Sequence, residues 1–457
     1  MMGMSEICRR AKTGPFMKAD DFDLDVLYAN ARQLSEKYKI NYDPQNPVPS
    51  DDDLADRTYK AAVDFVVAVG VYCPDTGRII KFTREEVLGA VANSRGSCTM
   101  GEGKDRFLWT PRRPDSDLKP WFHVGTGIFV TDERIAFNLT KAYAQIEQAN
   151  SVSVSALEKI DGQKSESGTP TEILAAIHSI KIARSALSHA GRPGLAIGNC
   201  ISAAGTSLAT IAASAPQFGL RPSDGWLVGA HAEMKFTMDM LNKATYLSCW
   251  GANIGNESGP LVGGYGGGPA EVAIINVAYR LIGLLVLNCD YHLTFPVHIT
   301  RSCSTPRDVL WTVAVSSQAI SRNTRELVWS LGYIAAGPMT KQFFYESAAY
   351  IATAISSGLS TQTCHPARAI RNDYITPMEM LGSVELTQSC VGLKRAEANE
   401  LVKELLRRYE DKIDDAPKGK KYQECYDVNT GRPIQEYADL YGEVKEELHA
   451  LGFRRLV

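Results

Sequence analysis

Residues 271–298 read EVAIINVAYRLIGLLVLNCDYHLTFPVH, and this stretch displays the pattern that governs the second half of the chain. An apolar run over 271–285 has the length of a helix and contains too many polar residues for a membrane span. A short apolar segment at 284–287 follows, which we expect to be a strand, and Tyr291 and His292 come after it. A helix followed by a short apolar strand and then by polar residues is typical of an α/β protein.

The same alternation recurs from residue 194 onward. Amphipathic helices are expected at 235–247, 271–285, 308–319, 341–357 and 377–392, with short apolar strands between them. This order predicts a (β/α)8 TIM barrel. We expect one domain over residues 1–457, with an N-terminal helical and hairpin elaboration over 1–125 and a C-terminal helical extension over 395–457. Within the first of these, helices are predicted at 20–40 and 52–70 and a hairpin at 72–82.

Composition excludes several classes of protein. The chain has 49 basic and 52 acidic residues, which indicates no large basic face for nucleic acid. Residues 1–15 lack the apolar core of a secretory signal. Ten cysteines without a Cys-x-x-Cys pair indicate a reducing compartment, and we expect the protein to be cytoplasmic, with no membrane partner and no metal site.

A glycine-rich segment marks the expected rim of an active site. Residues 257–269 read ESGPLVGGYGGGP, in which Glu257 precedes five glycines that surround Tyr265. Glycines at this density favour a close approach of backbone to a ligand or to another chain. Tyr265 is predicted to be either a stacking platform for a ligand or a plug of the barrel rim.

Six motifs in order over most of the chain resemble the monomethylamine methyltransferases of methylotrophic methanogens. They stand at 72–79, 190–194, 257–269, 291–293 together with 296–299, 336–338 and 422–428. The resemblance implies a TIM barrel, a separate corrinoid protein that docks over the barrel mouth, and a homo-oligomer, namely a hexamer.

This chain departs from that family at the residue that matters most. The resemblance places pyrrolysine, whose electrophilic ring captures the amine, four positions after the turn at 191–194. Here that position is Gly198 or a neighbour such as Asn199. Two polar positions of the family become Leu227 and Leu331. The family's glutamate and tyrosine remain as Glu257 and Tyr333, which we predict to be catalytic.

Functional residues of a TIM barrel follow its strands. Tyr291, His292, His298 and Tyr333 all come after apolar segments, so we place them at the mouth with Glu257. For each one a structural role is the alternative: His298 as a buried histidine with a backbone partner, and Glu257 as a helix cap. The candidates for substrate or corrinoid binding are Gly198, Asn199, Leu227, Tyr265, Tyr291, His292, His298 and Leu331.

Three functions are compatible with these residues. The first is a corrinoid-dependent methyltransferase that uses no pyrrolysine and takes a methyl group from a quaternary or other methylated amine, with cobalamin supplied by the partner protein and no tightly bound cofactor. The second is a homologue that binds a methylated ligand or a corrinoid protein without catalysis. The third is an unrelated barrel enzyme that binds phosphate through the backbone N–H groups of residues 263–268.

Overall fold

The computed structural model describes residues 3–454 and 456, except 126, 200–203 and 368–370. Eight parallel strands form one sheet whose spatial order is β11-β7-β5-β19-β17-β15-β13-β12. Read as a cycle, this is the order of the strands along the chain, which is the topology of a (β/α)8 barrel. The strands are β5 (Phe122–Val124), β7 (Ser151–Ser153), β11 (Ala196–Asn199), β12 (Gly225–Gly229), β13 (Asn253–Ser258), β15 (Tyr291–Thr294), β17 (Val328–Ser330) and β19 (Ser360–Gln362).

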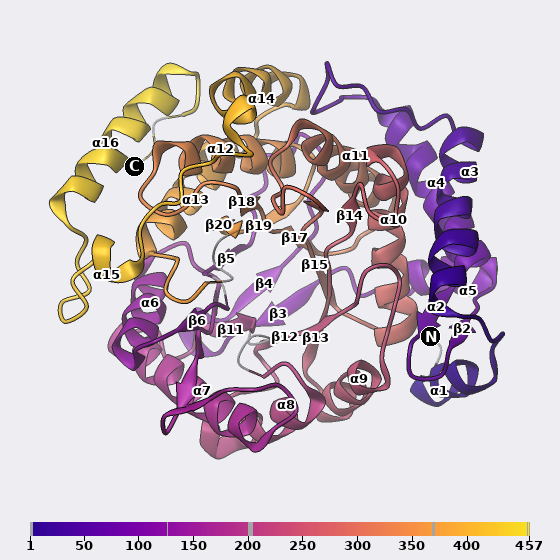
Figure 1. Cartoon of the computed structure of the whole chain (residues 1–457), viewed down its shortest axis with the longest axis horizontal. Helices are drawn as coiled ribbons and strands as arrows, with labels where there is room; N and C mark the ends of the chain where they lie inside the picture. Colours follow the sequence, from indigo (N-terminus) through magenta and orange to yellow (C-terminus); the bar gives the residue numbers. More distant parts are fainter. Residues whose placement is uncertain (1–2, 126, 200–203, 368–370, 455, 457) are drawn as a thin grey trace.

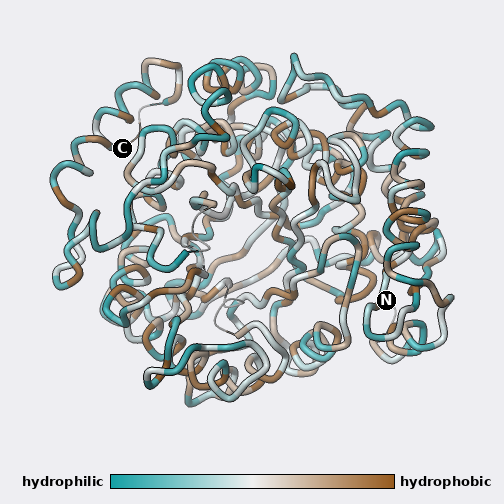
Figure 2. Tube along the Cα trace, in the orientation of Figure 1, coloured by the Kyte–Doolittle hydropathy of each residue, from teal (hydrophilic) through white to brown (hydrophobic). Residues whose placement is uncertain are grey.

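Helices surround the sheet as a ring (Figure 1), so the predicted TIM barrel is confirmed. Hydrophobic positions recur along each helix at intervals (Figure 2), as expected for helices with one face on a core. The ring consists of α6 (Glu133–Gln145), α7 (Pro170–His189), α8 (Ser207–Ala213), α9 (Met238–Trp250), α10 (Pro269–Ile282), α11 (Arg307–Asn323), α12 (Lys341–Ser356) and α13 (Pro377–Ser389).

One expected strand is wrong. Residues 284–287 do not form a strand but extend α10 as the π-helical turn η4 (Gly283–Leu287). Asn288, in the left-handed region at φ 50°, then ends the helix, and β15 begins at Tyr291. A short apolar run does not distinguish a buried helix from a buried strand, because neither has a polar face.

The helix from Pro269 to Leu287 is the one described helix that is long and apolar enough to cross a membrane. However, 94% of its most apolar window is buried inside the protein. It packs against α11 and α4 (Asp52–Val69) of the N-terminal elaboration. Its apolarity is therefore accounted for by the core.

The N-terminal elaboration lies along α10 and α11 at one side of the barrel (Figure 1). The predicted hairpin is confirmed as β1 (Val71–Cys73) paired with β2 (Arg78–Ile80). Other N-terminal elements are α1 (Met4–Thr13), α2 (Ala19–Asp21), η1 (Phe22–Tyr28), α3 (Ala29–Lys37) and α5 (Arg84–Ala92). At the opposite end of the chain come α14 (Arg395–Tyr409), η6 (Glu410–Lys412), α15 (Tyr422–Cys425) and α16 (Gln435–Ala450).

Short strand pairs extend the barrel beyond the ends of the main strands. Three of these pairs are parallel: β6 with β8, β14 with β16, and β18 with β20. The minor elements are β6 (Phe129–Val130), β8 (Ala156–Leu157), β9 (Lys159–Ile160), β10 (Gln163–Lys164), β14 (Leu261–Val262), β16 (Val297–His298), β18 (Tyr333–Ile334), β20 (His365–Pro366), η2 (Gly103–Asp105) and η3 (Pro216–Phe218).

A hairpin that the sequence did not predict closes the barrel at the amino-terminal ends of its strands. β3 (Cys98–Met100) pairs with β4 (Phe107–Trp109) and crosses the barrel in Figure 1. Its connecting loop bonds to residues just before β11 and β12, since Glu102 N donates to Gly194 O and Gly101 N to Ser223 O, both at 2.9 Å. Trp109 of β4 stacks on Trp329 inside the barrel, with the ring centroids 5.2 Å apart.

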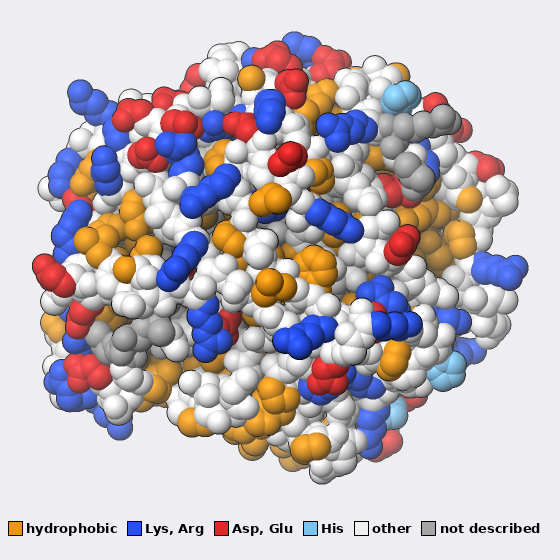
Figure 3. Space-filling model, turned by 180° about the vertical axis from the view of Figure 1, so that it is seen from behind, with side chains coloured by type: hydrophobic (Ala, Val, Ile, Leu, Met, Phe, Trp, Pro, Cys, Tyr) orange, Lys and Arg blue, Asp and Glu red, His pale blue; other side chains and the backbone are white. Residues whose placement is uncertain are grey.

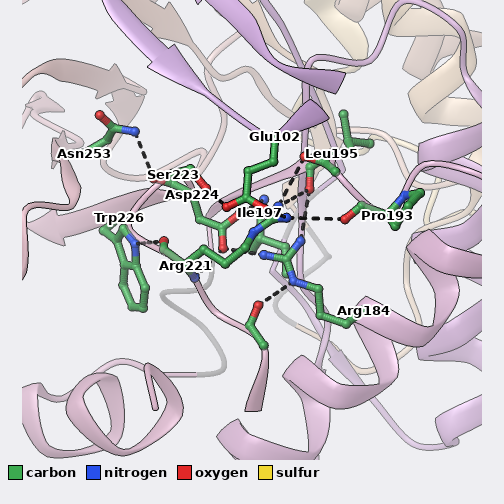
Figure 4. Close-up of polar contacts among 12 residues, drawn as sticks. Glu102, Arg184, Pro193, Leu195, Ile197, Arg221, Ser223, Asp224, Trp226 and Asn253 are labelled. Carbon is green, nitrogen blue, oxygen red and sulfur yellow. Dashed lines mark hydrogen bonds and ion pairs between the residues drawn. The ribbon is translucent and has the colours of Figure 1, made fainter. Parts of the chain in front are cut away.

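Asp224 joins β11 to β12 at the one seam of the sheet without a strand ladder. The backbones approach closely there: a Cβ on Gly225 would lie 3.1 Å from Gly198 O. The buried Asp224 carboxylate accepts from Ile197 N at 2.9 Å and forms ion pairs with Arg184 and Arg221 (Figure 4). This side chain thus replaces backbone hydrogen bonds across the seam.

We expect Asp224→Ala to lower the free energy of unfolding by about 3–5 kcal/mol, because it leaves the Arg184 guanidinium and Ile197 N–H without their buried partner. Urea unfolding followed by circular dichroism would measure this. The control is Asp53→Ala, which removes an exposed ion pair with Arg57 and should cost less than about 0.5 kcal/mol. A loss below about 1 kcal/mol for Asp224→Ala would contradict the role of this carboxylate.

Candidate functional site

The half of the barrel interior that is nearer the amino-terminal ends of the strands is apolar and aromatic. Alternate residues of each strand point inward, and this places Leu227 of β12 and Tyr291 of β15 in one buried cluster with Trp329 and Leu331. Trp109 fills the centre of this cluster. Tyr291 therefore lies deep in the barrel and not at the mouth, because it is the first residue of β15 and does not follow a strand.

Above this cluster, Glu257, Phe295, Tyr333 and His365 lie at the carboxyl ends of their strands. The ring of Tyr333 contacts Phe295 edge-on at 5.5 Å and His365 in a tilted arrangement at 4.5 Å. Burial raises the pKa of Tyr333, and the charge of Glu257 raises it further. The structure therefore brings the two predicted catalytic residues to one place.

Glu257 stands on the inward face of β13, next to the end of the strand. Its Oε2 atom is buried and has no hydrogen-bond partner among the described residues. Burial raises the pKa of this carboxyl to about 7, although the nearby Lys243 ammonium opposes the shift. It caps none of the helices that the structure describes, so the alternative of a structural cap does not apply to them.

A cavity of about 440 Å³ opens beside Glu257. One wall is made by the ends of β12 and β13 with Phe295, and the other by α9 and the residues before α8. The charged or titratable side chains in its lining are those of His231, Asp239, Lys243 and Glu257. Lys243, Asp239 and Phe295 were not among the predicted site residues, because the first two stand in no recognisable motif and Phe295 has the appearance of an ordinary apolar strand residue.

His365 was also missed as a site residue. It is buried, and neither ring nitrogen has a hydrogen-bond partner among the described residues. Burial lowers the pKa of this imidazole to about 3, so it stays neutral. The neighbouring Cys364 sits against Gly332 and Tyr350, away from the Tyr333 ring, which agrees with the expectation that adjacent strand residues point to opposite faces.

Gly198 faces the barrel interior, where no side chain fits. A Cβ at this position would lie 2.6 Å from His123 Nδ1 and 2.8 Å from Ser151 Oγ. His123 is held there by hydrogen bonds to Ser151 and Ser153 and by stacking on Trp329. Asn199 ends β11, but its side chain lies outside the described residues, as do residues 200–203.

Two predicted mouth residues lie elsewhere. His292 points outward from β15, where its Nε2 lies 3.1 Å from Glu326 Oε2, because the residue after an inward-facing Tyr291 must face the helices. His298 in β16 is half-buried near the surface, 3.8 Å from Asp308, with Thr300 at 3.1 Å. It is therefore not the buried histidine of the alternative interpretation, and it does not line the cavity.

The glycine loop folds on itself. Gly263 N donates to Gly267 O at 2.8 Å, Gly267 N to Gly264 O at 3.0 Å, and Gly268 N to the Glu271 carboxylate at 3.0 Å. These N–H groups are not available to cradle a phosphate. Tyr265 at the tip of the loop is 55% exposed, so it plugs nothing.

Among the described residues, no group of three or more histidine, cysteine or carboxylate side chains is placed to hold a metal ion. The nine described cysteines are free thiols. The expectation of no metal site stays a prediction, because Cys200 lies outside the described residues.

Comparison with known proteins identifies close architectural relatives. Residues 2–453 match the family model of the monomethylamine methyltransferase MtmB. MtmB3 of Methanosarcina barkeri and MtmB of Methanosarcina mazei are each 29% identical over 447 residues, which is 97% of this chain and 96% of each relative. The crystal structure of the Methanosarcina barkeri enzyme superposes with a TM-score of 0.93 at 27% identity, covering 99% of this chain and 98% of that one. These relatives are transferases, so the alternative of an unrelated phosphate-binding barrel is wrong.

The raised pKa of Glu257 has a measurable effect on stability. The unfolded carboxyl loses its proton near pH 4.5 and the folded one near pH 7, so this group makes the protein less stable as pH rises between these values. Glu257→Gln should therefore gain about 2–3 kcal/mol relative to wild type between pH 5 and pH 8.

Denaturant unfolding of both proteins at several pH values would measure this difference. The exposed Glu404→Gln serves as the control and should show no such trend. A constant difference between Glu257→Gln and wild type would mean that Glu257 ionises normally.

Proposed function

Because the chain belongs to the monomethylamine methyltransferase family, we propose that it transfers a methyl group from an N-methylated ammonium compound to the Co(I) atom of a corrinoid protein. The corrinoid is a co-substrate carried by the partner protein, and the barrel itself binds the methyl donor. The relatives' names refer to monomethylamine; for this chain we propose a donor that needs no pyrrolysine, namely a quaternary or otherwise cationic amine.

The observation that carries this proposal is the cluster of Glu257 and Phe295 in the cavity lining with Tyr333, whose ring lies 5.5 Å from that of Phe295. A carboxylate with an unpartnered oxygen attracts a cation, and aromatic faces attract a cation that has no N–H to donate. Leu227 and Leu331 supply an apolar floor beneath them. Methyl groups on nitrogen suit such a floor better than N–H groups, which would be left without acceptors there.

The chemistry also favours a cationic donor. When the N–CH3 bond breaks, its electron pair stays on nitrogen, and the electron pair of Co(I) forms the new bond to carbon, giving methyl-Co(III). A quaternary nitrogen leaves as a neutral amine and requires no proton. A neutral amine would leave as an anion unless it were first protonated or bound as an adduct, and Gly198 leaves no room for an electrophilic side chain.

Three further features remain proposals for this chain. The corrinoid protein docks over the mouth, the chain forms a homo-oligomer such as a hexamer, and it works in the cytoplasm without a tightly bound cofactor. Light scattering after gel filtration measures the oligomeric state. The cytoplasmic location is supported by the free thiols of the described cysteines, which suit a reducing compartment.

The visible spectrum of Co(I) cobalamin, or of a corrinoid protein, mixed with this protein and a panel of methylamines and quaternary amines tests the proposal. Formation of methyl-Co(III) with a quaternary donor is expected. Glu257→Gln should lower kcat/KM by about 100-fold, because a neutral amide attracts the cation weakly.

The matched pair Tyr333→Leu and Tyr265→Leu provides the control for this experiment, because each change removes an aromatic face. Only the first should reduce activity, since Tyr265 lies at the exposed loop tip. If every donor leaves Co(I) unmethylated while a known methyltransferase succeeds under the same conditions, the chain is a non-catalytic binding homologue.

A further inference from the structure

Two buried polar side chains, Asn276 and Arg280, interrupt the apolar surface of α10. Beyond its first turn the helix otherwise consists of apolar and aromatic residues. Because the two stand four residues apart, they lie one above the other on the same face of the helix. Arg280 Nη2 donates to Asn276 Oδ1 at 2.9 Å, so the two side chains form one polar pair inside the protein.

This pair contacts the carboxyl ends of two neighbouring strands. Arg280 Nη2 also donates to Ser258 Oγ at the end of β13, at 2.6 Å. Thr294 Oγ1 at the end of β15 donates to Asn276 Oδ1 at 2.8 Å. Ser258 and Thr294 are partners in the ladder between these strands. The amide of Asn276 is oriented by its other end, where Nδ2 donates to Ser316 Oγ of α11 at 2.8 Å.

Each contacted strand residue is next to a residue of the candidate site. Ser258 follows Glu257 in the chain, and Thr294 precedes Phe295. Since successive strand residues face opposite sides of a sheet, the pair on α10 lies behind the wall from which Glu257 and Phe295 face the cavity. A shift of either strand end would therefore move the carboxylate relative to the aromatic ring.

Arg280 is an unusual side chain for the buried face of a helix. On the surface seen in Figure 3, lysines and arginines lie among aspartates and glutamates, whereas Arg280 is buried. Its two side-chain acceptors, a hydroxyl and an amide, carry no charge, and its Nε and Nη1 have no hydrogen-bond partner among the described residues. Burial lowers its pKa to about 9, so it stays charged at neutral pH. A buried charge without a paired charge lowers stability, so packing alone does not account for this arginine.

Resting on the proposed function, we infer that Arg280 and Asn276 are positioning residues, which hold the carboxyl ends of β13 and β15 together behind the cavity. The Glu257 carboxylate and the Phe295 ring then act together on the cationic nitrogen of the methyl donor. This nitrogen is already positive in the bound donor and becomes neutral when the methyl group leaves. A displaced carboxylate should therefore weaken binding of the donor, so that KM rises while kcat changes little.

Isothermal titration of the full chain with choline and 3,3-dimethylbutan-1-ol tests this inference. The two probes have the same shape, but only choline has a positive nitrogen in place of the quaternary carbon. We expect wild type to bind choline about tenfold or more tightly than the alcohol. Arg280→Met should reduce this preference to below about threefold, whereas Arg280→Lys, which keeps the charge and can donate to both acceptors, should retain it.

Further variants separate positioning from folding. Ser258→Ala and Thr294→Val each remove one contact with a strand end, and each should weaken the preference for choline. They test the inference even if Arg280→Met does not fold. Arg112→Met is the matched control, because it removes another buried arginine, whose guanidinium donates to backbone carbonyls such as that of Leu359, before the start of β19. This variant should keep the wild-type preference.

An unchanged preference in a folded Arg280→Met variant would overturn the inference, as would an equal loss in Arg112→Met or equal binding of the two probes by wild type. In the methyl-transfer assay, a lower kcat of Arg280→Met at unchanged KM would also overturn it, because a smaller folded fraction has that effect. Methylation of Co(I) by a variant with wild-type KM leaves the proposed function intact and removes the positioning role. A preference that Arg280→Met loses, without any methylation by wild type, overturns the function and leaves the positioning role.

Discussion

The closed barrel imposes one constraint on which the rest of the structure depends: every second strand residue must fit into a narrow interior. Glycines at 198, 225 and 255 accept this crowding, because a Cβ at any of them would collide with a neighbour. The space that they leave is filled by His123 and Ser151 at Gly198 and by Tyr291 at the other two. Together with Trp109 and Trp329, Tyr291 forms a packed, buried floor beneath the mouth.

That floor explains the electrostatics of the mouth. Glu257 and His365 lie just above it, and burial is the largest cause of the pKa shift of each. Burial favours the neutral form in both cases, so it raises the pKa of the acid and lowers the pKa of the base. A polar atom in such a place without a partner is rare in folded proteins, and a ligand can supply the missing interaction. The site is therefore suited to a cation, whose charge compensates a carboxylate that burial disfavours.

The cavity wall opposite Glu257 comes from a different part of the chain. α9 brings Lys243 to it, while the contact between Asp239 and Ser207 fixes α9 against α8. Charges of opposite sign, Glu257 on β13 and Lys243 on α9, thus line one cavity.

Much of the architecture could be predicted from local patterns. The helices from 307 to 323 and from 341 to 356 carry a strong period, and the hairpin at 71–80 has turn residues at the right positions. Residues 284–287 could not be assigned correctly, because a run of apolar residues alone shows no hydrophobic periodicity that would distinguish a helix from a strand. The hairpin at 98–109 was missed for another reason: it is stabilised by contacts with the barrel, such as the stacking of Trp109 on Trp329, which the local sequence does not reveal.

The sequence by itself determined the barrel, the family and the candidates Glu257 and Tyr333, since periodicity and motif order are properties of the chain as written. Only the tertiary structure decided which candidates meet. It placed Tyr291 in the floor and turned His292 toward Glu326, because a shift of one residue along a strand reverses the face. It also added Phe295, His365 and Lys243, whose approach to Glu257 or Tyr333 depends on contacts between segments that are distant in sequence.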